Sequence, residues 1–129
     1  MKYVLDADVL IGALDGSDSH HARSRELFLA WQQQGETTLI SIVNLSEVLI
    51  APAADQARLR AARRAIAALG VTVHSPTEAI GVEAARLRAR HAISLPDGYL
   101  LATARQAGAT AVSFDRKIAR AAAAEAIPM

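Results

Sequence analysis

Short runs of apolar and β-branched residues alternate along this chain with longer stretches in which apolar residues recur at helical spacing. The short runs predict strands at Tyr3–Leu5, Thr37–Ile42, Val71–His74 and Ala109–Phe114. The longer stretches predict helices at Val9–Leu14, His20–Gln34, Val43–Ile50, Asp55–Leu69, Ser75–His91, Pro96–Gln106 and Arg116–Ala126. Because such alternation is typical of βαβ units, the pattern predicts an α/β protein with a central parallel sheet. We expect four to five strands, with Ile127–Met129 as the candidate for a fifth.

Length and composition narrow the class of protein further. The chain has 129 residues, of which 52% are hydrophobic, and we expect residues 1–129 to form a single domain. It contains no cysteine, which excludes cysteine zinc sites and thiol nucleophiles and is compatible with a reducing compartment. Asp6 and Asp8 interrupt the opening apolar run before it reaches the length of an export signal. No later stretch reaches the ~18 apolar residues of a membrane span, so we expect a cytoplasmic protein.

Acidic residues fall at similar places in several of the predicted units. Asp6 and Asp8 follow the first strand, Glu47 lies on the helix after the second, Asp97 begins a helix, and Asp115 follows the last strand. In open parallel sheets the ligand crevice lies at the carboxyl ends of the strands, and a helix start favours a nearby carboxylate. We therefore expect these acids to converge. Each also has an ordinary alternative: Asp97 as a helix N-cap or turn residue, Glu47 as a solvated helix residue, and Asp115 as a turn former.

Carboxylates that converge need compensation for their charge. At ~4 Å and an effective dielectric constant of ~20, each like-charge pair costs about 4 kcal/mol. Either some of the carboxyls stay protonated, with raised pKa values, or a hard cation lies among them. Oxygen ligands without cysteine favour Mg²⁺ or Mn²⁺ over zinc, and such ions promote hydrolysis of phosphodiesters. The acids thus indicate a metal-dependent phosphodiesterase.

Four segments resemble the motifs of the PIN domains and, within that family, of the VapC-type toxins of bacterial toxin–antitoxin pairs. They are Tyr3–Ile11, Ser41–Val48, Leu95–Ala104 and Val112–Asp115, in the family's order, and together they extend over nearly the whole chain. Two positions depart from the family pattern. Asp8 stands where Asn is commoner, and Gly98 stands where a larger residue is usual. Neither departure removes an acid.

The resemblance implies a three-layer α/β/α PIN-like fold and a Mg²⁺- or Mn²⁺-dependent endoribonuclease. It also implies a homodimer that is inhibited by a cognate VapB-type antitoxin and does not bind DNA directly without that antitoxin. The catalytic and metal-binding quartet carried over from the family is Asp6, Glu47, Asp97 and Asp115. Ser113 would assist the metal's water or the substrate, and Asp8 would add a further charge to the metal site.

Basic residues offer contacts for the RNA that such an enzyme would bind. Of the 14 basic residues 12 are arginines, whose planar fork suits phosphate, although a GC-rich genome would give the same composition. Three groups are candidates for backbone contacts: Arg58 with Arg60, Arg63 and Arg64; Arg86 with Arg88 and Arg90; and Arg116 with Lys117 and Arg120. The ordinary reading of each group is a solvated helix face. For the four histidines, His20, His21, His74 and His91, we expect solvated or capping roles.

Three other functions compete with the ribonuclease. Asp6-Ala7-Asp8 after a strand also resembles the nucleophile motif of aspartyl phosphotransferases, which need more chain and a lysine on its own loop. A receiver-like signalling domain would place its phosphorylated aspartate after the third strand, where this chain has Val73-His74. A catalytically inactive interaction module would keep the fold and lack one of the acids, whereas all four are present.

Overall fold

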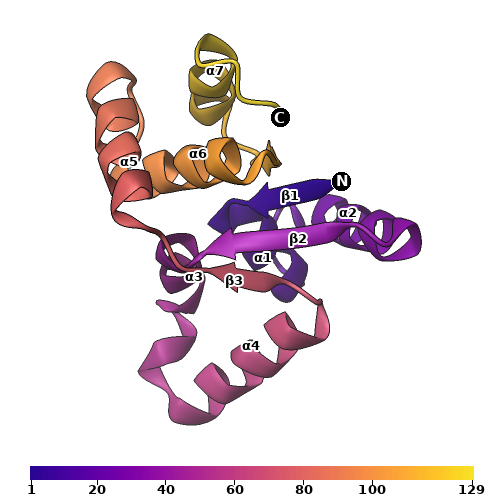
Figure 1. The fold of residues 1–129 in the computed structure, drawn as a ribbon. Coiled ribbons are helices and arrows are strands. Elements are labelled where there is room, and N and C mark those ends of the chain that lie inside the picture. Colours follow the sequence, from indigo (N-terminus) through magenta and orange to yellow (C-terminus); the bar gives the residue numbers. More distant parts are fainter.

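The sheet at the centre of the molecule has four parallel strands. The computed structural model describes residues 1–129, and its strands are β1 (Lys2–Leu5), β2 (Thr37–Ser41), β3 (Thr72–His74) and β4 (Thr110–Val112). They lie in the order β3-β2-β1-β4, and each neighbouring pair is parallel; the arrowheads of β1, β2 and β3 point to the same edge in Figure 1. The predicted α/β class with a parallel sheet is confirmed. Residues 127–129 form no fifth strand and contribute one ladder-like bond, from the Ala111 N–H to the Pro128 carbonyl at 2.9 Å.

Helices connect the strands at all the places where the sequence predicted them. They are α1 (Ala7–Leu14), α2 (His21–Gln34), α3 (Ile42–Leu49), α4 (Gln56–Ala68), α5 (Glu78–Arg90), α6 (Leu95–Ala107) and α7 (Arg116–Ala124), with a short 3-10 turn, η1 (Pro52–Ala54), before α4. β2 ends one residue earlier than predicted because the Ser41 side chain caps α3, accepting from the Val43 N–H at 3.3 Å. β4 ends two residues before the predicted Phe114.

The two faces of the sheet carry separate hydrophobic layers, because successive strand residues point to opposite sides. Val4 and Ala111 pack with α5, α6 and α7, whereas Leu5 and Ile40 pack with α1, α2 and α4. Figure 1 shows α5, α6 and α7 gathered above the sheet and α4 below it. The result is the three-layer α/β/α arrangement that the resemblance implied.

Gly98 allows α5 and α6 to pack unusually closely. A Cβ atom on Gly98 would lie 2.6 Å from the Ala84 carbonyl oxygen, which is closer than carbon and oxygen can approach. Gly98 is therefore a packing requirement of this chain, which explains its departure from the family pattern. Because Asp97 directly precedes it, the same close packing also determines where that acid lies.

Candidate active site

The candidate site lies where the order of the strands reverses. The chain passes from β1 to β2 and β3 on one side and then places β4 on the other side of β1, and such switch points form ligand crevices at the carboxyl ends. Asp6 follows β1 and Ser113 follows β4. The Asp6 N–H donates to the Val112 carbonyl at 2.9 Å, and the Ser113 hydroxyl donates to Asp6 Oδ2 at 2.7 Å. The two segments are thus joined directly at the crevice.

Asp8 shares the polar contacts of this crevice with Asp6. Its Oδ2 accepts from the Phe114 N–H at 2.9 Å and lies 3.5 Å from Ser113 Oγ. Its other oxygen, Oδ1, is buried and has no hydrogen-bond partner. Buried carboxylate oxygens are normally paired, so the unpaired Oδ1 of Asp8 is a candidate ligand for a cation.

Asp97 is held by the start of α6. Ser94 is the N-cap of the helix, and Asp97 is its third residue, so the alternative reading of Asp97 as the N-cap is wrong. The two residues form a capping box: Asp97 Oδ2 accepts from the Ser94 N–H at 2.9 Å, and Ser94 Oγ accepts from the Asp97 N–H at 3.3 Å. Only one carboxylate oxygen is used, and Asp97 Oδ1 makes no hydrogen bond within the protein.

Glu47 reaches the same region from α3 with the help of a buried amide. The Asn44 side chain, fully buried, donates from Nδ2 to Glu47 Oε1 at 3.2 Å and to the Pro96 carbonyl at 3.1 Å. Asn44 therefore ties Glu47 to the first turn of α6, where Asp97 lies. Glu47 itself is half-buried, not solvated as its ordinary reading had it.

Burial and mutual repulsion disfavour the ionised forms of these carboxyls. Burial, followed by the charge of Asp8, raises the pKa of Asp6 from 3.8 to about 7, and the charge of Asp97 adds to the rise. Burial also raises the pKa of Asp8. For Glu47 burial again raises the pKa, with further increases from the charges of Asp97 and Asp8. The structure thus brings four of the predicted acids within range of one another's charge.

Asp115 is placed differently from the other four acids. It is exposed and serves as the N-cap of α7, where its Oδ1 accepts from the Lys117 N–H at 2.8 Å. Its charge is not among the main causes of the raised pKa values of Asp6, Asp8 and Glu47. It touches the crevice only through its own N–H, which donates to Ser113 Oγ at 3.0 Å. Asp115 Oδ2 makes no hydrogen bond within the protein.

The donor set fits a hard divalent cation, although the carboxylates are not drawn together around one point. No three Asp, Glu or His side chains lie close enough to hold a metal ion between them. Mg²⁺, however, typically takes only one or two carboxylates and keeps several of its waters. The unpaired Asp8 Oδ1 and the raised pKa of Asp6 are the local signs of a position that favours a cation.

The basic residues divide into paired and unpaired groups. Five side chains on or next to α5, α6 and α7, which we name the ion cluster, are joined by ion pairs: Glu83, Arg90, His91, Arg105 and Glu125. Arg90, a candidate for RNA contact, is thus paired within the protein. The expected capping role of His91 is confirmed by its backbone, since it is the C-cap of α5, while its side chain pairs with Glu125. The four arginines of α4 and the basic residues of α7 are exposed and make no ion pair.

Three residues beside the acids were missed or set aside in the sequence. Asn44 lies within the second motif, and its spacing of three residues before Glu47 was a usable signal for a contact on one helix face. His20 and Phe114 meet across the fold, with their ring centroids 4.3 Å apart. No spacing in the sequence could have indicated that contact, since 94 positions separate the two residues (114 − 20).

Fold and site together define an α/β protein with a cluster of acidic residues at the switch point of a parallel sheet. The family model of the PIN domain matches residues 3–124, and the chain belongs to the PIN domain family. No curated protein sequence matches it.

Solved structures share this fold over almost the whole chain. The VapC20 toxin of Mycobacterium tuberculosis, described as cleaving the sarcin-ricin loop, is 19% identical, with a TM-score of 0.75 over 92% of this chain and 94% of that one. VapBC-1 of nontypeable Haemophilus influenzae is 16% identical, with a TM-score of 0.72 over 96% and 94%. FitAcB of Neisseria gonorrhoeae is 20% identical, with a TM-score of 0.67 over 94% and 93%.

Proposed function

We propose that this chain is a Mg²⁺- or Mn²⁺-dependent endoribonuclease and the toxin of a toxin–antitoxin pair. The observation that carries the proposal is the group of Asp6, Asp8, Glu47 and Asp97 at the switch point, whose charges no basic side chain of the protein pairs. Membership of the PIN family makes the phosphotransferase and receiver alternatives unnecessary. None of the helices is long and apolar enough to cross a membrane.

Some residues of the site would bind the cation, and others would orient the reacting groups. Asp6, Asp8 and Asp97 would bind the cation, and Glu47 would lie at the edge of this group of ligands. When bound, such an ion activates a water for attack on phosphorus and neutralises charge on the leaving oxygen. Ser113, whose hydroxyl already contacts Asp6, would orient the carboxylate or the substrate. We keep Asp115 as a further ligand, through its unused Oδ2.

Two preformed contacts would keep the acids in place before RNA arrives. The capping box fixes Asp97 on α6, and Asn44 fixes Glu47 against the same helix. Positioning of this kind lets binding energy go into the transition state, because the ligands need not be ordered during the reaction. The arginines of α4 and the basic residues of α7 would supply contacts to the flanking phosphates.

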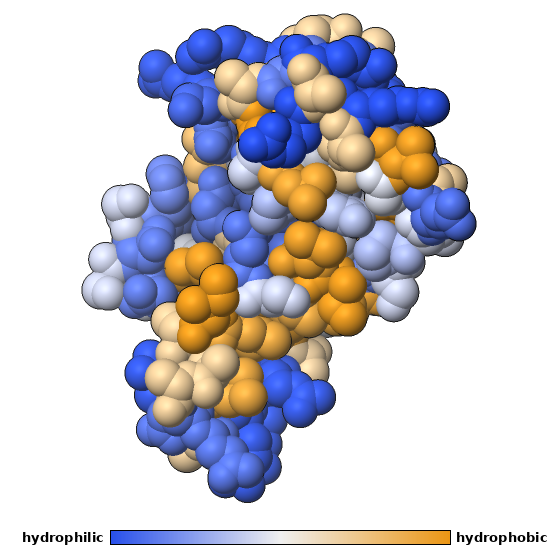
Figure 2. Space-filling view, turned by 90° about the vertical axis from the view of Figure 1, so that its left-hand side faces the viewer, coloured by the Kyte–Doolittle hydropathy of each residue, from blue (hydrophilic) through white to orange (hydrophobic).

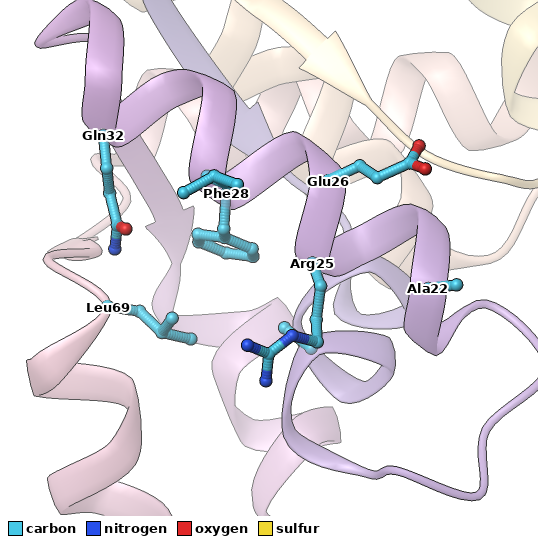
Figure 3. A pocket seen from close by; sticks show the side chains of 8 residues that line it. Ala22, Arg25, Glu26, Phe28, Gln32 and Leu69 are labelled. Carbon is cyan, nitrogen blue, oxygen red and sulfur yellow. The ribbon is translucent and has the colours of Figure 1, made fainter.

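An antitoxin segment would find two hollows, one between α1 and α2 near the end of α4 and one between α1, α3 and α4. The first, of about 310 Å³, is lined by Phe28 and Leu69 with Arg25 at its rim (Figure 3). The second, of about 570 Å³, is mainly apolar and includes Arg58 and Glu47 in its lining. A segment with apolar side chains and an acid would complement both, and at the second hollow it would lie against an acid of the site. That several of the similar structures are toxin–antitoxin complexes supports such a partner.

A second copy of the chain would cover apolar side chains at the carboxyl edge of the sheet. Ile42 on α3, Val82 on α5 and Leu95 on α6 are each more than two-fifths exposed, and α6 contacts both of the other helices. Figure 2 shows hydrophobic residues gathered across the middle of this face, between hydrophilic regions above and below. We propose a homodimer through these three helices, and Leu95→Glu should convert it to a monomer in light scattering.

Cleavage of a mixed-sequence RNA tests the proposed activity. Cutting should require Mg²⁺ or Mn²⁺, stop in excess EDTA and be lost in Asp6→Asn and Asp97→Asn. A phosphoaspartate mimic should have no effect, which separates the ribonuclease from an aspartyl phosphotransferase. Gln33→Ala, on the exposed end of α2 far from the acids in sequence, is a matched surface control. RNA cutting that persists in EDTA would contradict the metal mechanism.

A further inference from the structure

Two aromatic rings form an exposed stack beside the acidic site. The His20 and Phe114 rings lie 4.3 Å apart between centroids, with 22° between their planes. Phe114 is half-buried, whereas His20 is exposed, so the imidazole keeps solvent-accessible surface beyond its contact with Phe114. A flat ring whose outer face is open is the kind of surface on which unstacked nucleobases bind.

The stack is held in a defined position relative to the acids. Phe114 directly follows Ser113, and its N–H donates to Asp8 Oδ2 at 2.9 Å. His20 is close enough for its charge to act on Asp8. A base on the open face of His20 would therefore place its own phosphates next to Asp6 and Asp8.

The neighbouring histidine, His21, has a structural role that His20 lacks. His21 is half-buried, and its Nδ1 is 2.7 Å from the Gly12 carbonyl, which joins α2 to α1. The His20 ring makes no hydrogen bond to the protein; only its backbone does, through its N–H to Asp18 Oδ1 and its carbonyl to Ser24. The His20 ring thus packs on Phe114 and forms no hydrogen bond that would make it structural.

The other large aromatic rings are already used inside the fold. Tyr3 stacks on Trp31, and Phe28 packs edge-on against the same indole, each at 5.1 Å between centroids. Tyr99 packs against the other hydrophobic layer. Only His20 and Phe114 combine an aromatic face with proximity to the acids.

We propose that the His20–Phe114 stack is a nucleobase subsite, where a single-stranded base adjacent to the scissile phosphate stacks on the outer face of His20. The inference rests on the proposed ribonuclease function and adds how its RNA is held. Stacking requires the flat ring and not the ring nitrogens. It also tolerates any base, because every base has a π face.

A pair of substitutions at one position separates stacking from hydrogen bonding. His20→Phe keeps a flat ring without nitrogens, and His20→Gln keeps a polar group without a ring. On a short RNA with a mapped cut, His20→Gln should raise KM about 5-fold or more with kcat within about twofold, in line with the loss of one base–aromatic stack. His20→Phe should restore the wild-type KM, and Gln33→Ala, near the other end of the helix that His20 precedes, serves as the control. An unchanged KM in His20→Gln overturns the subsite, as does an equal loss of kcat in both His20 variants.

A binding measurement gives a readout that does not depend on catalysis. The same RNA, carrying 2-aminopurine next to the cut, is titrated with Asp6→Asn protein, which does not cut it. Stacking on His20 should quench the fluorescence, and adding His20→Gln to this background should abolish the quenching. Quenching that persists in the double variant overturns the subsite while leaving the ribonuclease intact. Absence of metal-dependent cutting by the wild-type protein would instead contradict the proposed function.

Discussion

Two groups of charged side chains lie at opposite ends of α6, and they are built in opposite ways. At its first turn, Asp97 joins acids that have no basic partner, and burial raises the pKa of Asp6 to about 7. At its last turn, Arg105 joins the ion cluster, where hydrogen bonds from His91 and Arg105 lower the pKa of Glu125 to about 2. The ion cluster is compensated within the protein, whereas the buried acids must either hold protons or bind a cation.

Asp6→Asn should have the largest effect of these changes: it should lower the activity and raise the stability of the metal-free protein. We expect RNA cleavage to fall at least ~100-fold, because loss of a partner outside the metal's own ligands already costs 10–100-fold. In metal-free buffer at pH 8 the variant should be more stable than wild type by about 1 kcal/mol or more, since each unit of pKa shift is worth about 1.4 kcal/mol. Cleavage assays and urea unfolding measure the two effects.

The pH dependence of that stability follows from the direction of the shift. The pKa of Asp6 is higher in the folded chain, about 7, than its ordinary value of 3.8, so the folded state holds the proton more tightly. Wild-type stability without metal should therefore fall as pH rises through this interval and stay level above it. Asp6→Asn should show a shallower fall, with the remainder due to Asp8 and Glu47. An unchanged slope would contradict the burial of a protonated Asp6.

Addition of Mg²⁺ should stabilise the folded protein through the acidic group and not through the ion cluster. A ligand at 100 times its Kd adds about 2.7 kcal/mol to the free energy of unfolding. We expect a rise of that order in wild type and in Glu125→Gln, and little or none in Asp6→Asn. Thermal unfolding across a Mg²⁺ titration measures it, and the rise should weaken below pH 7 because protons compete for the ligands. Equal stabilisation of Asp6→Asn would place the cation elsewhere.

Gly98→Ala should lower both the stability of the protein and its activity. The added Cβ would lie 2.6 Å from the Ala84 carbonyl oxygen, so α5 and α6 must separate. Overpacking of this kind costs about 1–3 kcal/mol, and we also expect reduced cleavage because Asp97 moves with the helix. Gly16→Ala, where nothing lies within 4 Å of the new Cβ, is the matched control. Unfolding and cleavage that match the control would show that the two helices can adapt.

Substitutions of Asp115 separate its helix cap from its proposed role as a ligand. Asp115→Ala removes both and should destabilise the protein by about 1 kcal/mol, the usual value of an N-cap. Asp115→Ser keeps a capping oxygen and removes the carboxylate, so stability should be retained while cleavage falls. If Asp115→Ser cuts RNA as well as wild type does, Asp115 is only a cap.

Glu125→Gln should have the smallest effect, and only on stability. Glu125 has a lower pKa in the folded chain, so its ion pairs contribute above its ordinary pKa of 4.5, and the contribution is lost as pH falls toward about 2. The wild-type and variant unfolding curves should therefore converge in acid and separate slightly at neutral pH. Cleavage should be unchanged, and a loss of cleavage would link the ion cluster to the site.

The sequence was sufficient for the elements and for the identity of the acids. Apolar spacing predicted the α-helices and the four strands to within a few residues, because burial of one face requires that spacing; it did not predict η1, and the candidate fifth strand did not form. The acids could be selected from their positions along the chain. Asp6 and Asp8 follow the first strand, Glu47 lies on the helix after the second strand, and Asp97 begins a helix.

Only the tertiary structure decided which side chains meet. It turned the Asp115 carboxylate toward its own helix, placed Asn44 between Glu47 and Pro96, and joined His91 to Glu125. It also stacked His20 on Phe114 and required a glycine at position 98. Contacts of this kind depend on the packing of whole helices against the sheet, whereas periodicity in the sequence reports only which face of each element is buried.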